Sequence, residues 1–88
     1  MKENEIRVGN KENSAYLNAV LHIFNNNSGS TIHIRGLGSQ GEKAIEVAEK
    51  ESELVPALDF DRIESIKVDG VQGHDAILRS KGGEPRRE

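Results

Sequence analysis

The chain has 88 residues, which suits one small domain and leaves no room for a second independent core. Twelve Lys and Arg residues against 15 Asp and Glu residues give a net charge of −3, which disfavours binding to duplex nucleic acid by overall charge alone. The absence of cysteine excludes disulfides, thiolate nucleophiles and cysteine-based metal centres. A single domain over residues 1–81 is expected, and its small size favours self-association.

No apolar run approaches the roughly 20 residues of a membrane span, and residues 1–15 lack the apolar segment of a signal peptide. We therefore expect a cytoplasmic protein with no membrane partner, and association with a nucleoid stays open. The only aromatic residues are Tyr16, Phe24 and Phe60. Three are too few for a platform on which bases stack, so any contact with nucleic acid is expected to involve its backbone.

The first half of the chain predicts a strand, a helix and a second strand. Residues 6–8 are β-branched or charged and precede a Gly-Asn turn, which indicates a short strand. A helical apolar stripe follows from Asn13, and the polar residues 25–29 end it. The stripe consists of Tyr16, Leu17, Val20, Leu21 and Phe24. Residues 31–35 then alternate between apolar and polar, as a half-buried strand does.

The second half predicts a helix and two further strands. Ser39 and Glu42 match a capping box, so a helix is expected to begin at Ser39 and to end before Pro56. Its outer face is expected to carry Glu46, Glu49, Lys50, Glu51 and Glu53. After a linker through Phe60, residues 63–68 and 76–78 indicate two strands around the Asp69-Gly70 turn. Residues 71–73 leave room for a bulge.

The resulting order is β-α-β-α-β-β, which predicts an α/β (α+β) fold. Right-handed crossovers place both helices on one face of a mixed sheet. Residues 82–88 contain no apolar side chain that could dock on the domain, so they are expected to form a flexible tail.

The most informative segment for function is the turn that contains Gly36, Gly38 and Ser39, between a strand and a helix. Free amides at a helix N-terminus bind anions, and glycine lets a phosphate approach the backbone. Arg35 and Lys43 flank this turn, and Lys11 is expected at the same edge of the sheet if the first two strands are parallel. The alternative is a plain strand-to-helix connection with solvated charges, because a third glycine is missing from the nucleotide-binding pattern.

Other candidates for chemistry are weak. His22, His33 and His74 lack the spacing of metal ligands, and they are expected at the surface without a metal. Two acidic groups are expected to be solvated, namely Asp59 with Asp61 and Glu49 with Glu51 and Glu53. No catalytic motif occurs, so neither an enzyme nor a cofactor is expected.

The segments 16–21, 24–25, 32–38 and 43–49 together resemble the Alba family of small archaeal chromatin and RNA-binding proteins. The resemblance covers residues 6–80 and implies a dimer with DNA and/or RNA as its partner. Residues of the family that contact nucleic acid correspond to Lys11, Arg35 and Lys43. The resemblance places the dimer interface at Leu54, Val55 and Phe60. The chain is also similar to the Alba-like stage V sporulation protein S of bacteria.

The chain departs from the family pattern where Asn10, Leu37 and Ser39 replace basic residues. Its last hairpin is expected to be short, with no Lys or Arg between Asp69 and Asp75. We expect a homodimer that binds phosphates largely without sequence preference, through Lys11, Arg35 and Lys43 and the amides of Gly38 and Ser39. Lys43→Glu is expected to abolish binding and, as a surface change, to alter stability by at most about 0.5 kcal/mol.

Two alternatives remain open. One is a regulatory or protein-interaction module that has weak or lost nucleic-acid binding. The negative net charge supports this alternative. The other is a binder of nucleotides or other small ligands that uses the glycine turn.

Overall fold

The computed structural model describes residues 4–26 and 31–80. The elements follow in the order β1 (Glu5–Arg7), α1 (Asn13–Asn26), β2 (Thr31–Leu37), α2 (Gln40–Leu54), β3 (Leu58–Val68) and β4 (Val71–Ser80). The predicted β-α-β-α-β-β order is therefore confirmed. The predicted tail 82–88 and the end of the predicted turn after α1 lie outside the described residues.

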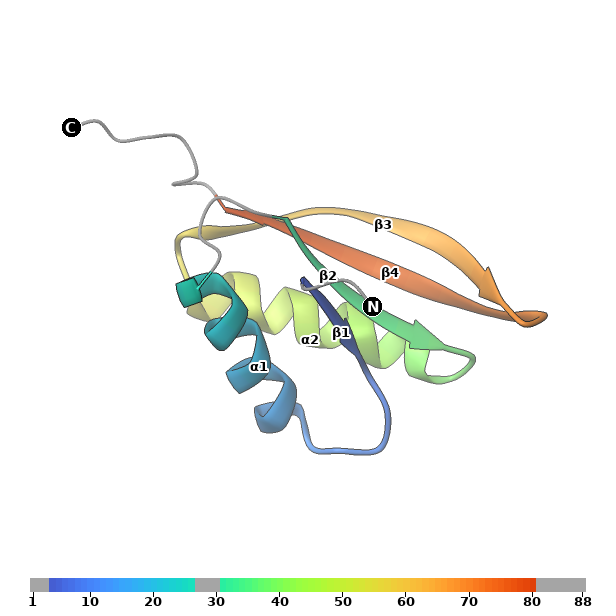
Figure 1. Cartoon of the computed structure of the whole chain (residues 1–88). Coiled ribbons are helices and arrows are strands. Elements are labelled where there is room, and N and C mark those ends of the chain that lie inside the picture. The colour runs from blue at the N-terminus through green and yellow to red at the C-terminus, as the bar shows by residue number, and fades with distance from the viewer. Residues whose placement is uncertain (1–3, 27–30, 81–88) are drawn as a thin grey trace.

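The four strands form one mixed sheet in the order β1-β2-β4-β3. β1 runs parallel to β2, whereas β4 is antiparallel to both β2 and β3. Both helices lie on one face of this sheet, as Figure 1 shows, and this confirms the predicted α+β architecture. The opposite face has no helix over it among the described residues.

The hydrophobic core lies between the sheet and the two helices. Ile32 and Ile34 of β2 point toward the helices because alternate residues of a strand share a face. Val47 of α2 is completely buried in the same core. In α1 the buried positions are Tyr16, Val20 and Ile23, whereas Leu21 is exposed.

α2 differs from its prediction at its start and on its outer face. Ser39 occupies the N-cap position with helical backbone angles, and its side chain makes no capping hydrogen bond, so the predicted capping box does not form. Gly38, with φ of +58°, turns the chain instead, and the Gly41 N–H donates to the Gly38 carbonyl at 3.0 Å. The helix ends at Leu54, before Pro56. Glu51, predicted on the outer face, is buried.

The β3–β4 hairpin is longer than predicted. The expected linker through Phe60 is wrong, because β3 already begins at Leu58 and contains an irregularity between Phe60 and Arg62. The first part of β3 was missed because charged residues on an exposed edge strand interrupt the apolar alternation by which a strand is recognised in a sequence. The Asp69-Gly70 turn is confirmed, with both residues at positive φ and Val68 paired with Val71. Residues 71–73 pair in regular register with β3 and contain no bulge.

Candidate nucleic-acid interface

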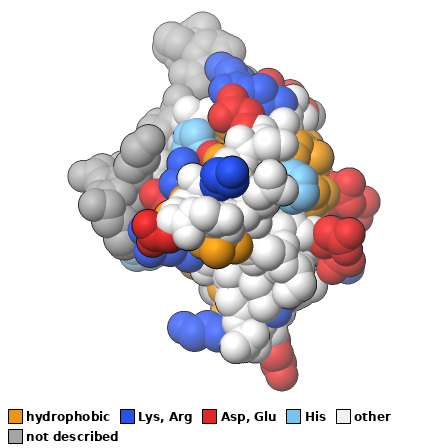
Figure 2. Space-filling view, turned by 90° about the vertical axis from the view of Figure 1, so that its right-hand side faces the viewer, with side chains coloured by type: hydrophobic (Ala, Val, Ile, Leu, Met, Phe, Trp, Pro, Cys, Tyr) orange, Lys and Arg blue, Asp and Glu red, His pale blue; other side chains and the backbone are white. Residues whose placement is uncertain are grey.

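One end of the molecule gathers the β1–α1 loop, the β2–α2 turn, the first turn of α2 and the hairpin turn (Figure 1). We call this the basic end and define it by Arg7, Lys11, Lys43 and Lys67. The chain leaves β1 and β2 at the same edge of the sheet because these two strands are parallel. Figure 2 looks onto this end and shows Lys and Arg side chains in several separate places, with carboxylates toward the sides.

Lys43 joins the first turn of α2 to the β1–α1 loop. Its ammonium donates to the Gly9 carbonyl at 3.0 Å and also to the Lys11 carbonyl. The same ammonium lies 5.4 Å from the centre of the Tyr16 ring, within the range of a cation–π interaction. Lys43 is half-buried and is therefore more than a surface charge. The expectation that Lys43→Glu leaves stability almost unchanged does not fit this geometry.

Tyr16 holds the same loop from its amide side. The phenolic oxygen accepts hydrogen bonds from the backbone N–H of Gly9 at 2.7 Å and of Lys11 at 3.0 Å. Burial raises the pKa of Tyr16, but these two N–H donors and the ammonium groups of Lys43 and Lys11 lower it more, so the net pKa lies below its usual value. The loop backbone is thus held through both its amides and its carbonyls, and it presents an exposed Lys11 side chain.

The backbone of the glycine turn is engaged in contacts within the fold. The Gly38 N–H already donates to the Gln72 carbonyl at 2.6 Å, so it is not free for a phosphate. Gly36 is buried, and a Cβ there would lie 2.0 Å from the Gln40 carbonyl oxygen. Gly36 therefore permits close packing of β2 against α2, and this structural role explains the glycine without a ligand. Ser39 is exposed at the N-cap and can meet a ligand.

Arg35 belongs to a different surface, the helix-free face of the sheet. Its guanidinium contacts Glu5 Oε2 at 3.2 Å and Asp75 Oδ2 at 3.4 Å. Both carboxylate side chains are almost completely buried. Asp75 Oδ2 also lies 2.9 Å from His33 Nδ1, so His33 is a paired, half-buried residue instead of a free surface residue. The structure thus brings Lys11 and Lys43 together but holds Arg35 between two carboxylates.

Sequence reasoning missed two basic residues at this end. The Arg7 side chain is 78% exposed and lies beside Arg35 in the β1–β2 register. Together they line a cavity of about 220 Å³ whose apolar wall includes Leu37 and Val68. Lys67 is exposed on the hairpin. The parallel pairing of β1 and β2 could have indicated Arg7. Lys67 could be placed at this end only once the full length of β3 was known.

The predicted dimer residues lie at the end of α2 and along β3. Leu54 is 61% exposed, and Val55 and Phe60 are half-buried against the edge of the core. Ile63 of β3 is also exposed. These four residues give the chain an apolar surface away from the basic end, and we call it the apolar patch.

Two further properties concern only residues 4–26 and 31–80. No group of three or more His, Asp or Glu side chains in these ranges could hold a metal ion. Neither helix is long and apolar enough to cross a membrane.

Comparisons with known proteins agree with this architecture. The family model for Alba matches residues 4–50. The crystal structure of ALBA1 from Trypanosoma brucei aligns with a TM-score of 0.79 at 15% identity, over 94% of this chain and 74% of that chain, so it shows a shared fold. Alba from Thermoplasma volcanium is 28% identical, with a TM-score of 0.60 over 88% of this chain and 95% of that chain. No curated protein sequence matches significantly. The family model covers more than half of the residues of this chain, and the chain therefore belongs to the Alba family.

Proposed function

We propose that this protein binds DNA and/or RNA through phosphate contacts at its basic end, acts as a homodimer, and has a chromatin or RNA-associated role. The observation that supports this most is the joint attachment of Lys11 and Lys43 to one fixed loop. Lys43 is tied to the loop carbonyls, and Lys11 extends from the same backbone into solvent. A rigid backbone reduces the entropy lost when these ammonium groups meet a phosphate.

The positive charge that supports this proposal is concentrated at the basic end, although the net charge of the chain is negative. The N-terminal end of α2 carries the positive end of the helix dipole, and anions are stabilised there. Lys67 adds an exposed positive charge at the same end of the sheet, and so does Arg7, whose 78% exposed side chain contacts Glu5 Oε2 at 3.5 Å. A net charge of −3 opposes binding at long range, so we expect affinity that depends on close contacts and falls steeply with salt.

Replacing Lys11 with glutamine should weaken binding and reduce its salt dependence. Each lost phosphate contact should lower the slope of log affinity against log salt by about 0.7 to 0.9. Fluorescence anisotropy would measure binding to duplex DNA, single-stranded DNA and structured RNA between about 50 and about 200 mM salt, the range over which such contacts lose most affinity.

Lys50→Gln is the matched control, because Lys50 is an exposed lysine of α2 outside the basic end. It removes the same charge and should leave the slope unchanged. An equal effect of both variants would mean that only net charge matters. If the wild type binds none of the three nucleic acids, the proposed function is wrong and the protein-interaction alternative gains support.

The apolar patch supports the homodimer. Leu54→Glu places a carboxylate where an apolar side chain is 61% exposed, so it should raise the dimer dissociation constant at least about tenfold with little effect on the fold of the monomer. Light scattering after size-exclusion chromatography, over a dilution series, would measure this change. Leu21→Glu is the control, since Leu21 is an exposed leucine on α1 that is not one of the four patch residues. A dimer that survives Leu54→Glu unchanged would place the interface elsewhere.

A further inference from the structure

The cavity of about 220 Å³ that Arg7 and Arg35 line has an apolar wall at the surface of the molecule. Leu37, Ile66 and Val68 belong to this wall. Leu37 is 36% exposed and Val68 is 40% exposed, although both side chains are apolar. We call this hollow the Arg7–Arg35 cavity.

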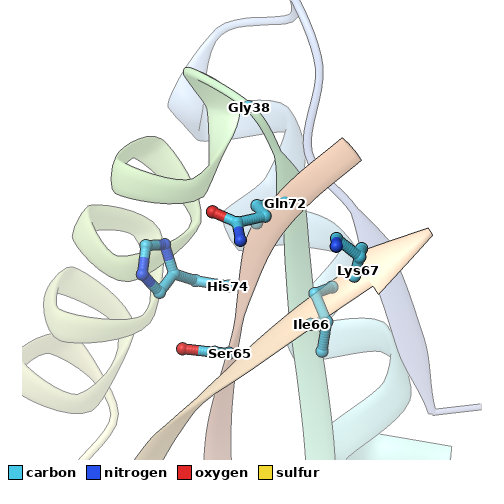
Figure 3. A pocket seen from close by; sticks show the side chains of 7 residues that line it. Gly38, Ser65, Ile66, Lys67, Gln72 and His74 are labelled. Carbon is cyan, nitrogen blue, oxygen red and sulfur yellow. The ribbon is translucent and has the colours of Figure 1, made fainter. Parts of the chain in front are cut away.

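The strand register places this apolar wall on the helix-free face of the sheet. Leu37 of β2 and Ile66 of β3 both pair with Gly73 of β4, and directly opposite residues share a face. Gly73 has no side chain to separate the two apolar ones. Figure 3 shows the other side of the hairpin, where Ser65 and His74 extend toward α2 whereas Ile66 extends in a different direction. The wall is therefore separate from the side chains that face the helices.

The two arginines supply the polar side of the cavity. The Arg7 side chain is mostly exposed and contacts Glu5 Oε2 at 3.5 Å. Arg35 donates from Nε to Asp75 and from Nη1 to Glu5, and its Nη2 has no hydrogen-bond partner among the described residues. A guanidinium has five N–H donors, so both arginines retain donors for a ligand. Neither Glu5 nor Asp75 lines the cavity.

The charge around the cavity is positive beyond the two arginines. Glu5 and Asp75 balance the charges of Arg7 and Arg35, but the three lysines of the basic end make no ion pair with a carboxylate of the described residues. One of them, Lys67, lies between two wall residues in the sequence. A ligand that reaches the cavity therefore meets an excess of positive charge, which favours an anion.

The size of the cavity indicates which part of a ligand enters it. Drug-sized ligands occupy about 300 to about 1,000 Å³, and this cavity is smaller and suits one large apolar side chain. In protein interfaces an apolar or aromatic anchor in such a pocket supplies much of the affinity. Val71, which pairs with Val68 and is 46% exposed, extends the apolar surface beyond the cavity. Exposed apolar surface with a polar rim marks sites of protein contact.

We propose that the Arg7–Arg35 cavity docks an acidic segment of a partner protein. One large apolar side chain of the segment fills the cavity, and its neighbouring carboxylates pair with Arg7 and Arg35. The inference does not rest on the proposed function, because Lys11 and Lys43 do not line the cavity.

Amide NMR titrations with synthetic peptides test this inference. The probe is a short peptide with one phenylalanine among glutamates. A second peptide replaces the phenylalanine with alanine, and a third replaces the glutamates with glutamines. The probe should give saturable shifts at Arg7, Leu37, Ile66 and Val68. Each of the other two peptides should bind at least about fivefold more weakly, since each lacks one half of the recognition.

Variants of the protein locate the contact. Val68→Glu places a carboxylate in the apolar wall at an exposed position and should abolish the shifts. Arg7→Gln should weaken the affinity about threefold to fivefold, as the loss of a strong exposed ion pair does. Arg79→Gln is the matched control and should change nothing. Arg79 is 60% exposed and contacts one carboxylate, that of Asp61, but it lies at the end of β4 away from the hairpin turn.

The remaining outcomes would overturn the inference. Equal losses in Arg7→Gln and Arg79→Gln would mean that overall charge alone attracts the peptide. Shifts at the wall residues that appear when the protein alone is concentrated would identify a second copy as the occupant. Shifts with a short single-stranded RNA and none with the probe would assign the cavity to the nucleic-acid interface. If the probe binds while no nucleic acid does, the inference stands and the proposed function fails.

Discussion

Replacing Glu51 with glutamine is expected to stabilise the protein by about 2 to 3 kcal/mol near pH 8 and to change its stability little near pH 5. Glu51 is 1% exposed, and neither of its carboxylate oxygens has a hydrogen-bond partner among the described residues. Burial raises the pKa of this carboxyl from 4.5 to about 7. Near pH 8 the folded protein therefore holds an unpaired buried charge.

The sign of the pH dependence follows from the direction of this shift. The folded state binds the proton of Glu51 more tightly than the unfolded state, because its pKa is higher. The free energy of unfolding therefore falls as pH rises from about 4.5 to about 7, and the full penalty persists above that range. Glutamine has nearly the same size and no charge, so it removes the penalty only where the carboxyl is ionised.

Urea unfolding of the wild type and Glu51→Gln, repeated between about pH 5 and about pH 8, would measure the difference, because midpoint and slope together give the free energy of unfolding. Glu53→Gln is the matched control: Glu53 lies on the same helix but is exposed, so its replacement should have no pH-dependent effect of this size. Parallel pH profiles for the wild type and Glu51→Gln would show that Glu51 is solvated or paired in solution.

The element order could be predicted because each element carries its own periodicity. Residues 31–35 alternate strictly, and the Asp69-Gly70 pair adopts the two positive φ angles that a tight hairpin requires. These signals are local, so a single sequence reveals them. The first part of β3 carries no such signal, because Asp59, Asp61 and Arg62 interrupt it at an exposed edge.

The candidate site was harder to predict, since its contacts join residues far apart in the chain. Arg35 meets Glu5 and Asp75 across 30 and 40 positions, and nothing local to Arg35 indicates that both carboxylates would be buried beside it. Glu51 shows the same limit. It lies among acidic residues of α2 that are otherwise exposed, and only the packing of the helix against the sheet determines that this one faces inward.

Lys43 shows why a basic residue that the sequence predicts as a phosphate ligand can also have a structural role. The spacing to the glycine turn marks it as a phosphate ligand, whereas the structure also makes it the link between α2 and the β1–α1 loop. Its charge and its attachment to the loop are therefore coupled. A substitution there changes the interface in two ways, and the experiment must separate them.

Lys43→Glu is expected to weaken nucleic-acid binding at least about tenfold and to destabilise the fold by about 2 to 4 kcal/mol. The loss of stability has three sources: two hydrogen bonds from a charged donor, the contact with the Tyr16 ring, and the repulsion of a carboxylate by the carbonyls of Gly9 and Lys11. Urea unfolding measures the stability. Anisotropy, recorded well below the melting temperature of the variant, measures the affinity.

Tyr16→Phe separates the two roles. It removes the acceptor of the Gly9 and Lys11 N–H groups but retains every positive charge, and it should cost about 1 to 2 kcal/mol of stability. A much smaller loss of affinity in Tyr16→Phe than in Lys43→Glu would show that the ammonium group itself contacts phosphate. Equal losses would mean that Lys43 acts by positioning the loop, and Lys11 would then be the main phosphate ligand. Unchanged affinity in Lys43→Glu would contradict both roles and exclude this loop from the interface.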